Sequence, residues 1–134
     1  MFLLLFAAAV TTASHVETLP SDYNLAYKQS VAEHKPLMVM VGAPWCPACN
    51  VMKDTTLKSI EQSGELSQVS FAVVDRDAQP ELAEQLLKGE KMIPRLIVFT
   101  KIDGAWKREE LKGYQPTQPV RSLIRRAVSR VHNN

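Results

Sequence analysis

Short runs of apolar residues, bounded by residues that break regular structure, recur along the chain. Residues 37–42 (LMVMVG) contain no polar side chain, so they predict a strand that is buried on both faces. Residues 69–75 and 95–100 predict two further strands. Residues 105–112 are more polar and follow the hairpin signal Asp103-Gly104, which predicts a fourth strand at an edge of the sheet.

Segments with the apolar spacing of helices separate these strands. Residues 22–33 predict a helix capped at its first residue, and residues 47–64 predict a helix that bends near residues 54–56. Residues 80–88 predict a short helix, and Thr117 is the expected cap of a last one. The apolar face of this last helix consists of Val120, Leu123, Ile124, Ala127, Val128 and Val131. The alternation predicts an α/β fold with a mixed, mostly parallel sheet of about four strands flanked by helices.

The composition excludes several classes of protein. The chain has 134 residues, of which 46% are hydrophobic and 22% charged, as in one folded domain rather than a disordered chain. The net charge of +2 argues against nucleic acid as a partner. It combines −5 over residues 1–90 with +7 over residues 91–134. Four arginines of the last predicted helix form either a docking face for an acidic partner or membrane, or a solvated face: Arg121, Arg125, Arg126 and Arg130.

The beginning of the chain is a separate apolar segment. Residues 2–10 carry no charge, and the first charged residue is Glu17. The segment is shorter than the ~20 apolar residues that span a bilayer, and small residues follow it at positions 11–14, as at a cleavage site. We therefore expect a signal peptide over residues 1–14, a mature domain over residues 15–134, and a periplasmic or secreted protein. The alternative is a buried first strand or helix of the domain.

The two cysteines form one motif, Cys46-Pro47-Ala48-Cys49. They follow a predicted buried strand and open a predicted helix, where unpaired amide groups and the helix dipole stabilise a thiolate. The spacing lets both sulfurs close a disulfide within one turn, with Cys46 as the attacking and Cys49 as the resolving thiol. The three histidines lie at no zinc-ligand spacing, so the sequence predicts no metal and no cofactor. A purely structural disulfide is the alternative.

The surroundings of the cysteine pair resemble the thioredoxin superfamily. The matching residues are Ala43-Pro44-Trp45 before the pair, Met92-Ile93-Pro94 before a predicted strand, and Gly113 ahead of the last helix. The resemblance is closest to small extracytoplasmic thioredoxin-like domains, including the C-terminal domain of the membrane reductase that supplies electrons to the periplasm. It implies a thioredoxin-like fold over residues 23–131 and a cis bond between Ile93 and Pro94. It also implies that the Ile93 backbone pairs with an extended substrate and that Trp45 flanks the site, core packing being the alternative for Trp45.

Three positions depart from the pattern of that superfamily. Met40 and Val73 stand where it often carries a buried acid and a lysine, so the usual proton relay for Cys49 is absent. Arg95 follows the proline, where thioredoxins often have threonine. A guanidinium close to Cys46 would favour its thiolate and acidic substrates. The alternative for Arg95 is a solvated strand start.

The sequence thus predicts a thiol–disulfide oxidoreductase in which Cys46 attacks a protein disulfide and Cys49 releases the product. The resemblance to reducing domains favours reduction of protein disulfides by a monomer outside the cytoplasm, with a membrane-bound electron donor as partner. The expected substrate-binding residues are Trp45, Ile93, Pro94 and Arg95. The alternative is a peptide-binding or chaperone-like module in which the redox activity is incidental.

Overall fold

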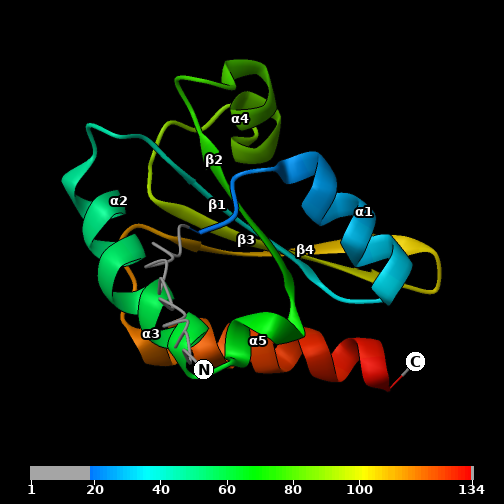
Figure 1. Ribbon diagram of the computed structural model, residues 1–134. Helices are drawn as coiled ribbons and strands as arrows, with labels where there is room; N and C mark the ends of the chain where they lie inside the picture. Colours follow the sequence, from blue (N-terminus) through cyan, green and yellow to red (C-terminus); the bar gives the residue numbers. More distant parts are fainter. Residues whose placement is uncertain (1–18, 134) are drawn as a thin grey trace, which may run out of the picture.

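Four strands form the central sheet of the computed structural model, which describes residues 19–133 (Figure 1). The predicted signal segment lies outside these residues. The strands are β1 (Leu37–Gly42), β2 (Ser70–Asp75), β3 (Arg95–Ile102) and β4 (Ala105–Lys112). Their order across the sheet is β2-β1-β3-β4, so the polar strand β4 lies at an edge, as predicted.

The directions of the strands correct one expectation. β1 is parallel to β2 but antiparallel to β3, and β3 is antiparallel to β4. The sheet is therefore mixed, as expected, but it is not mostly parallel. The short helix α4 (Pro80–Leu87) packs in one cluster with Val41 and Val74, near the carboxyl ends of β1 and β2. α1 (Tyr23–Glu33) packs on the same face, and the chain enters β3 from the end of the sheet at which it left β2 (Figure 1).

Helices cover both faces of the sheet. α1 and α4 lie on one face, whereas α2 (Pro47–Val51), α3 (Lys58–Gln62) and α5 (Thr117–His132) lie on the other. β1 runs between the two layers, and all six of its residues are buried, as its uninterrupted apolar sequence predicted.

The helix after the cysteines changes its hydrogen-bonding pattern where the sequence predicted a bend. Met52–Leu57, between α2 and α3, forms a π-helical segment. The hydroxyl of Thr55 donates a hydrogen bond to the carbonyl of Val51 at 2.6 Å, and bonds of this kind often bend helices. A 3-10 turn, Glu65–Gln68, then leads into β2.

The start of α5 differs from the prediction by one residue. Pro116 is the N-cap, and Thr117 is the first helical residue and makes no capping bond through its side chain. The predicted apolar face is confirmed at the four positions that are fully covered: Val120, Leu123, Ile124 and Ala127. Within residues 19–133, no helix is long and apolar enough to cross a membrane.

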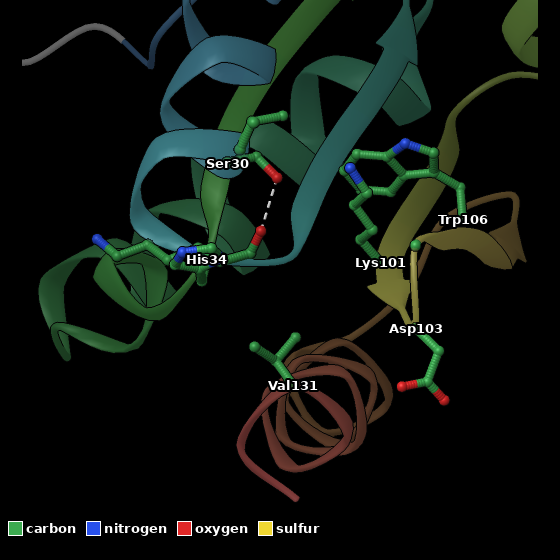
Figure 2. A pocket seen from close by; sticks show the side chains of 9 residues that line it. Ser30, His34, Lys101, Asp103, Trp106 and Val131 are labelled. Atoms are coloured by element: carbon green, nitrogen blue, oxygen red, sulfur yellow. Dashed lines mark hydrogen bonds between the residues drawn. The ribbon is translucent and has the colours of Figure 1, made fainter. Parts of the chain in front are cut away.

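A surface cavity of about 470 Å³ lies at the amino end of β1, where α1 ends beside the β3–β4 hairpin (Figure 2). His34 and Lys101 line it together with Trp106, and the Lys101 ammonium lies 5.7 Å from the Trp106 ring centroid. The cysteine pair follows the opposite, carboxyl end of β1. This cavity is therefore separate from the predicted active site.

Candidate active site

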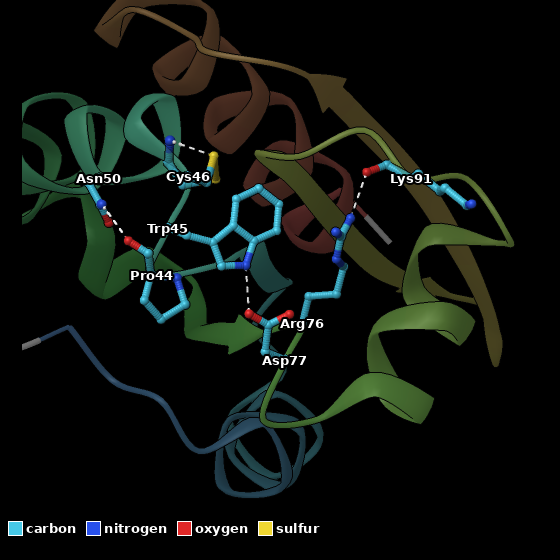
Figure 3. The surroundings of a disulfide bond; sticks show 8 residues. Pro44, Trp45, Cys46, Asn50, Arg76, Asp77 and Lys91 are labelled. Atoms are coloured by element: carbon cyan, nitrogen blue, oxygen red, sulfur yellow. Dashed lines mark hydrogen bonds between the residues drawn. A yellow bond between two sulfur atoms is a disulfide. The ribbon is translucent and has the colours of Figure 1, made fainter.

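The Cys46–Cys49 disulfide lies where β1 turns into α2 (Figure 3). Cys46 is the N-cap of α2, and Pro47 occupies the first helical turn. The amide of Cys49 donates a hydrogen bond to the sulfur of Cys46 at 3.2 Å, so a first-turn donor already points at the sulfur predicted to become the thiolate. Cys46 is 6% exposed, whereas Cys49 is completely buried. This difference agrees with Cys46 as the attacking and Cys49 as the resolving thiol.

Cys49 packs directly against the end of β1. A Cβ atom added to Gly42 would lie 3.2 Å from both Cβ and Sγ of Cys49, so the close approach depends on glycine. Met40 and Val73 are direct partners in the β1–β2 register, and both pack in the core cluster that contains Cys49. At these two positions, where the superfamily often has a proton relay, this chain thus has apolar contacts and no proton acceptor.

Trp45 lies on the surface beside the disulfide, with 59% of the residue exposed (Figure 3). Its indole N–H donates a hydrogen bond to Asp77 Oδ2 at 2.6 Å. The guanidinium of Arg76 lies 5.2 Å from the ring centroid, within the range of a cation–π contact. Core packing of Trp45 is therefore wrong, because the ring is held against the loop after β2 and is not enclosed. A contact between Trp45 and substrate stays a prediction.

The bond between Ile93 and Pro94 is cis, as the resemblance implied. Val41 pairs with Arg95 in the antiparallel register of β1 and β3. Continuing that register by one residue brings Pro94 level with Gly42, which contacts the buried cysteine. The register therefore brings the cis-proline to the end of β1 that carries the disulfide.

The backbone on the two sides of this proline differs in its hydrogen bonds. The carbonyl of Pro94 accepts a hydrogen bond from the amide of Gly113 at 2.8 Å. Neither the amide nor the carbonyl of Ile93 has a hydrogen-bond partner among residues 19–133. Ile93 therefore has both backbone groups available for another chain, as its predicted pairing with an extended substrate requires.

Arg95 is completely buried at the first position of β3. Its guanidinium donates hydrogen bonds to Glu90 at 2.8 Å, to Glu110 at 3.1 Å and to the carbonyl of Met92 at 3.3 Å. The two carboxylates offset the cost of removing the cation from water. A solvated strand start is therefore wrong for Arg95. Because none of its side chain is exposed, Arg95 can act on a substrate only through the residues that it holds.

The carboxylates around Arg95 belong to a wider ionic network. The ammonium of Lys112 lies 3.0 Å from Glu90, and Arg108 lies 2.7 Å from Glu110. Hydrogen bonds from Lys112 and Arg95 lower the pKa of Glu90. Burial raises the pKa of Glu110, but hydrogen bonds from Arg108 and Arg95 outweigh it, so the pKa is lowered there too. The network thus favours the charged form of both carboxyl groups.

Three of the four arginines on α5 form ion pairs with carboxylates of residues 19–133. Arg121 lies 2.6 Å from Glu65, Arg130 lies 2.6 Å from Glu109, and Arg126 lies 3.6 Å from Glu109. Of these pairs, Arg121–Glu65 joins the basic last part of the sequence to the acidic first part, whereas Glu109 belongs to the last part itself. These pairs favour a solvated face over a docking face for an acidic partner or membrane.

Comparisons with known proteins agree with the fold. The thioredoxin family model matches residues 18–126. Protein disulfide-isomerase of Gallus gallus is 32% identical over 101 residues, which are 75% of this chain and 19% of that protein. Thioredoxin of Alicyclobacillus acidocaldarius subsp. acidocaldarius is 29% identical over 98 residues, which are 73% of this chain and 87% of that protein. The crystal structure of the DsbD C-terminal domain of Neisseria meningitidis superposes with a TM-score of 0.61 at 21% identity, covering 82% of this chain and 99% of that one.

The chain belongs to the thioredoxin family. It spans about a fifth of the length of the isomerase and most of the length of the bacterial thioredoxin. The thioredoxin fold, together with the Cys46–Cys49 disulfide, supports thiol–disulfide oxidoreductase activity.

The residues that hold Trp45 and Arg95 were missed from the sequence. Asp77 and Arg76 follow the second strand and contact Trp45, which follows the first. A signal was available, because the carboxyl ends of two parallel neighbouring strands meet at one edge of a sheet. No comparable signal marks Glu90 as a partner of Arg95, since nothing in the sequence indicates that Arg95 is buried.

We expect the free energy of unfolding to fall on acidification, partly because Glu90 and Glu110 lose their charge. Each has a folded-state pKa below its ordinary value of 4.5. Their stabilisation is therefore complete above that value and is lost as the pH falls through the folded-state pKa. Urea unfolding at a series of pH values measures this dependence. The free energy of unfolding of the Glu90→Gln/Glu110→Gln variant should depend less on pH in the acidic range. If it depends on pH as much as that of the wild type, these two carboxyl groups are not responsible.

Proposed function

We propose that the protein reduces protein disulfides outside the cytoplasm, with Cys46 and Cys49 as its redox centre. The observation that carries the proposal is the unequal exposure of the two sulfur-bearing residues. Cys46 has some contact with solvent, whereas Cys49 has none. An external disulfide therefore meets Cys46, and Cys49 acts only after a mixed disulfide has formed.

The exchange has two balanced steps. The Cys46 thiolate attacks one sulfur of the substrate disulfide, forms a mixed disulfide and displaces the other substrate sulfur as a thiolate. Cys49 then loses its proton and attacks the Cys46 sulfur, which breaks the mixed disulfide and releases the second substrate thiolate. The substrate gains two electrons, and the Cys46–Cys49 pair is oxidised. A membrane-bound reductase is the proposed donor that returns these electrons.

The proposed substrates are extended segments of proteins that carry a disulfide. The free amide and carbonyl of Ile93 support backbone pairing with such a segment. The exposed ring of Trp45 supplies apolar surface beside the disulfide, and the buried Pro94 supports the backbone directly after Ile93. The proposed acting form is a monomer, because each of these groups comes from one chain.

Replacing the resolving thiol should trap substrates. We expect the Cys49→Ala variant to accumulate covalent adducts through Cys46, because the mixed disulfide can no longer be resolved within the protein. Non-reducing electrophoresis of the variant, expressed in its native compartment and captured by affinity, detects the adducts and provides the clients for identification. The Cys46→Ala/Cys49→Ala variant is the matched control and should carry none.

The same pair of variants separates catalysis from peptide binding. If the double variant retains clients non-covalently and Cys49→Ala forms no adduct, the protein is a peptide-binding or chaperone-like module. The free backbone of Ile93 is the observation that favours this second candidate, because it would serve a bound peptide with or without redox chemistry.

The direction of the reaction is tested by the reduction potential. The reduction potential of thioredoxin is about −270 mV, and that of a strongly oxidising periplasmic oxidase is about −120 mV. A reductase should lie toward the first value, so we expect a potential below about −150 mV. Equilibration with glutathione buffers, followed by quantification of the two thiols, measures it. A higher potential would instead favour an oxidase or isomerase.

The proposed location rests on the apolar segment of residues 2–10. When the full chain is expressed in a bacterium with a periplasm, we expect the periplasmic fraction to hold a form that lacks residues 1–14. Mass spectrometry of the intact protein identifies its first residue. A Leu3→Arg/Leu5→Arg variant should remain in the cytoplasm with its N-terminal segment attached. Recovery of the uncleaved wild-type chain from the periplasm would exclude the proposed cleavage.

A further inference from the structure

The loop before Pro94 is held by a buried arginine. We call residues 90–93 the cis-proline loop. Arg95 donates hydrogen bonds to the side chain of Glu90 at 2.8 Å and to the carbonyl of Met92 at 3.3 Å. One side chain, at the first residue of the central strand β3, therefore contacts the loop at two positions.

A second arginine holds the residue between those two. Arg76 follows β2, and its Nη1 atom donates a hydrogen bond to the carbonyl of Lys91 at 2.9 Å (Figure 3). The same guanidinium lies over the ring of Trp45. The cis-proline loop is thus tied to the sheet on one side and to the loop that supports Trp45 on the other.

These contacts leave the carbonyl of Ile93 unbonded between bonded neighbours. The carbonyls of Lys91 and Met92 accept hydrogen bonds from the two arginines, and the carbonyl of Pro94 accepts one from Gly113. The carbonyl of Ile93 has no partner among residues 19–133, and neither have the amides of Lys91, Met92 and Ile93. The carbonyls on either side are thus occupied, whereas both backbone polar groups of Ile93 are free.

We propose that Arg95 is a positioning residue for substrate, which fixes the cis-proline loop so that Ile93 presents its amide and carbonyl to a disulfide-bearing peptide. The proposal rests on the proposed function, since it concerns how that substrate is recognised. Arg95 does not touch the substrate, because its side chain is completely buried. Its effect reaches the peptide through Glu90 and Met92.

Stability alone gives no reason for an arginine at this position. Its Nε atom is buried and has no partner among residues 19–133, and such unsatisfied donors destabilise a fold. Replacement of a buried ion pair by apolar side chains of similar volume is often neutral or stabilising. What an apolar residue could not provide is the pair of directed bonds to Glu90 and to the carbonyl of Met92.

The test compares a disulfide whose peptide backbone can pair with Ile93 of the cis-proline loop and a small disulfide that has no such backbone. Reduced wild type and the Arg95→Met variant are each oxidised by a disulfide-linked peptide and by 2-hydroxyethyl disulfide, which has no peptide backbone. We expect the rate constant for the peptide to fall about tenfold in the variant, the effect of losing one or two hydrogen bonds. The rate constant for the small disulfide should stay within about twofold, because the sulfur chemistry of Cys46 is unchanged.

Two further variants make the result specific. Arg130→Met removes a surface ion pair with Glu109 and should leave both rate constants unchanged. Glu90→Ala removes one of the contacts of Arg95 and should lower the peptide rate in the same direction as Arg95→Met. The Glu90 side chain is half exposed, so we expect Glu90→Ala to fold. It replaces Arg95→Met in the comparison if circular dichroism shows that Arg95→Met does not fold.

The outcomes separate this proposal from the proposed function. If wild type is oxidised by neither disulfide, the redox function itself fails. If wild type reacts with both, and Arg95→Met slows both equally or neither, the positioning role is overturned and the redox function stands. If Arg95→Met slows only the reaction with the peptide disulfide, the result supports both the redox function and the positioning role of Arg95.

Discussion

Strand β1 lies in the interior of the sheet with no exposed residue on either face. A strand of this kind requires a helical layer on each side, because its apolar side chains alternate between the two faces. α1 and α4 meet this requirement on one face, and α2, α3 and α5 meet it on the other. The turn from β1 into α2 fixes the position of Cys46. Its neighbours β2 and β3 bring the two loops that surround the disulfide to the same end.

The contact between Gly42 and Cys49 turns this architecture into a redox site. Glycine at the last position of β1 lets the start of the helix approach until the buried sulfur lies against the strand. The antiparallel pairing of β3 with β1 then places Pro94 at the same level of the sheet. A parallel β3 would enter from the other end and carry the cis-proline away from the disulfide. The direction of β3, which the alternation of elements did not predict, is therefore a condition of the site.

Sequence patterns predicted the features that depend on local chemistry. The apolar run of β1, the polar edge strand β4, the irregular helical segment after Val51 and the positions of the cysteines all follow from residues close in the chain. The features that the patterns missed depend on distant partners. Trp45 is held on the surface by a hydrogen bond to Asp77, 32 residues away. Arg95 is buried because carboxylates 5 and 15 residues away surround it, and a single sequence carries no record of such pairs.

Two arginines hold the cis-proline loop from different sides. Arg76 joins this loop to Trp45, since its guanidinium lies over the indole ring and donates a hydrogen bond to the carbonyl of Lys91. Arg95 holds the loop from within the fold, because its own side chain is completely buried. Arg95 belongs to a central strand, and side chains built on strands are positioned more precisely than those on loops. A loop held in this way would lose little conformational entropy in the proposed pairing of Ile93 with an extended peptide, so more of the pairing energy would remain for binding.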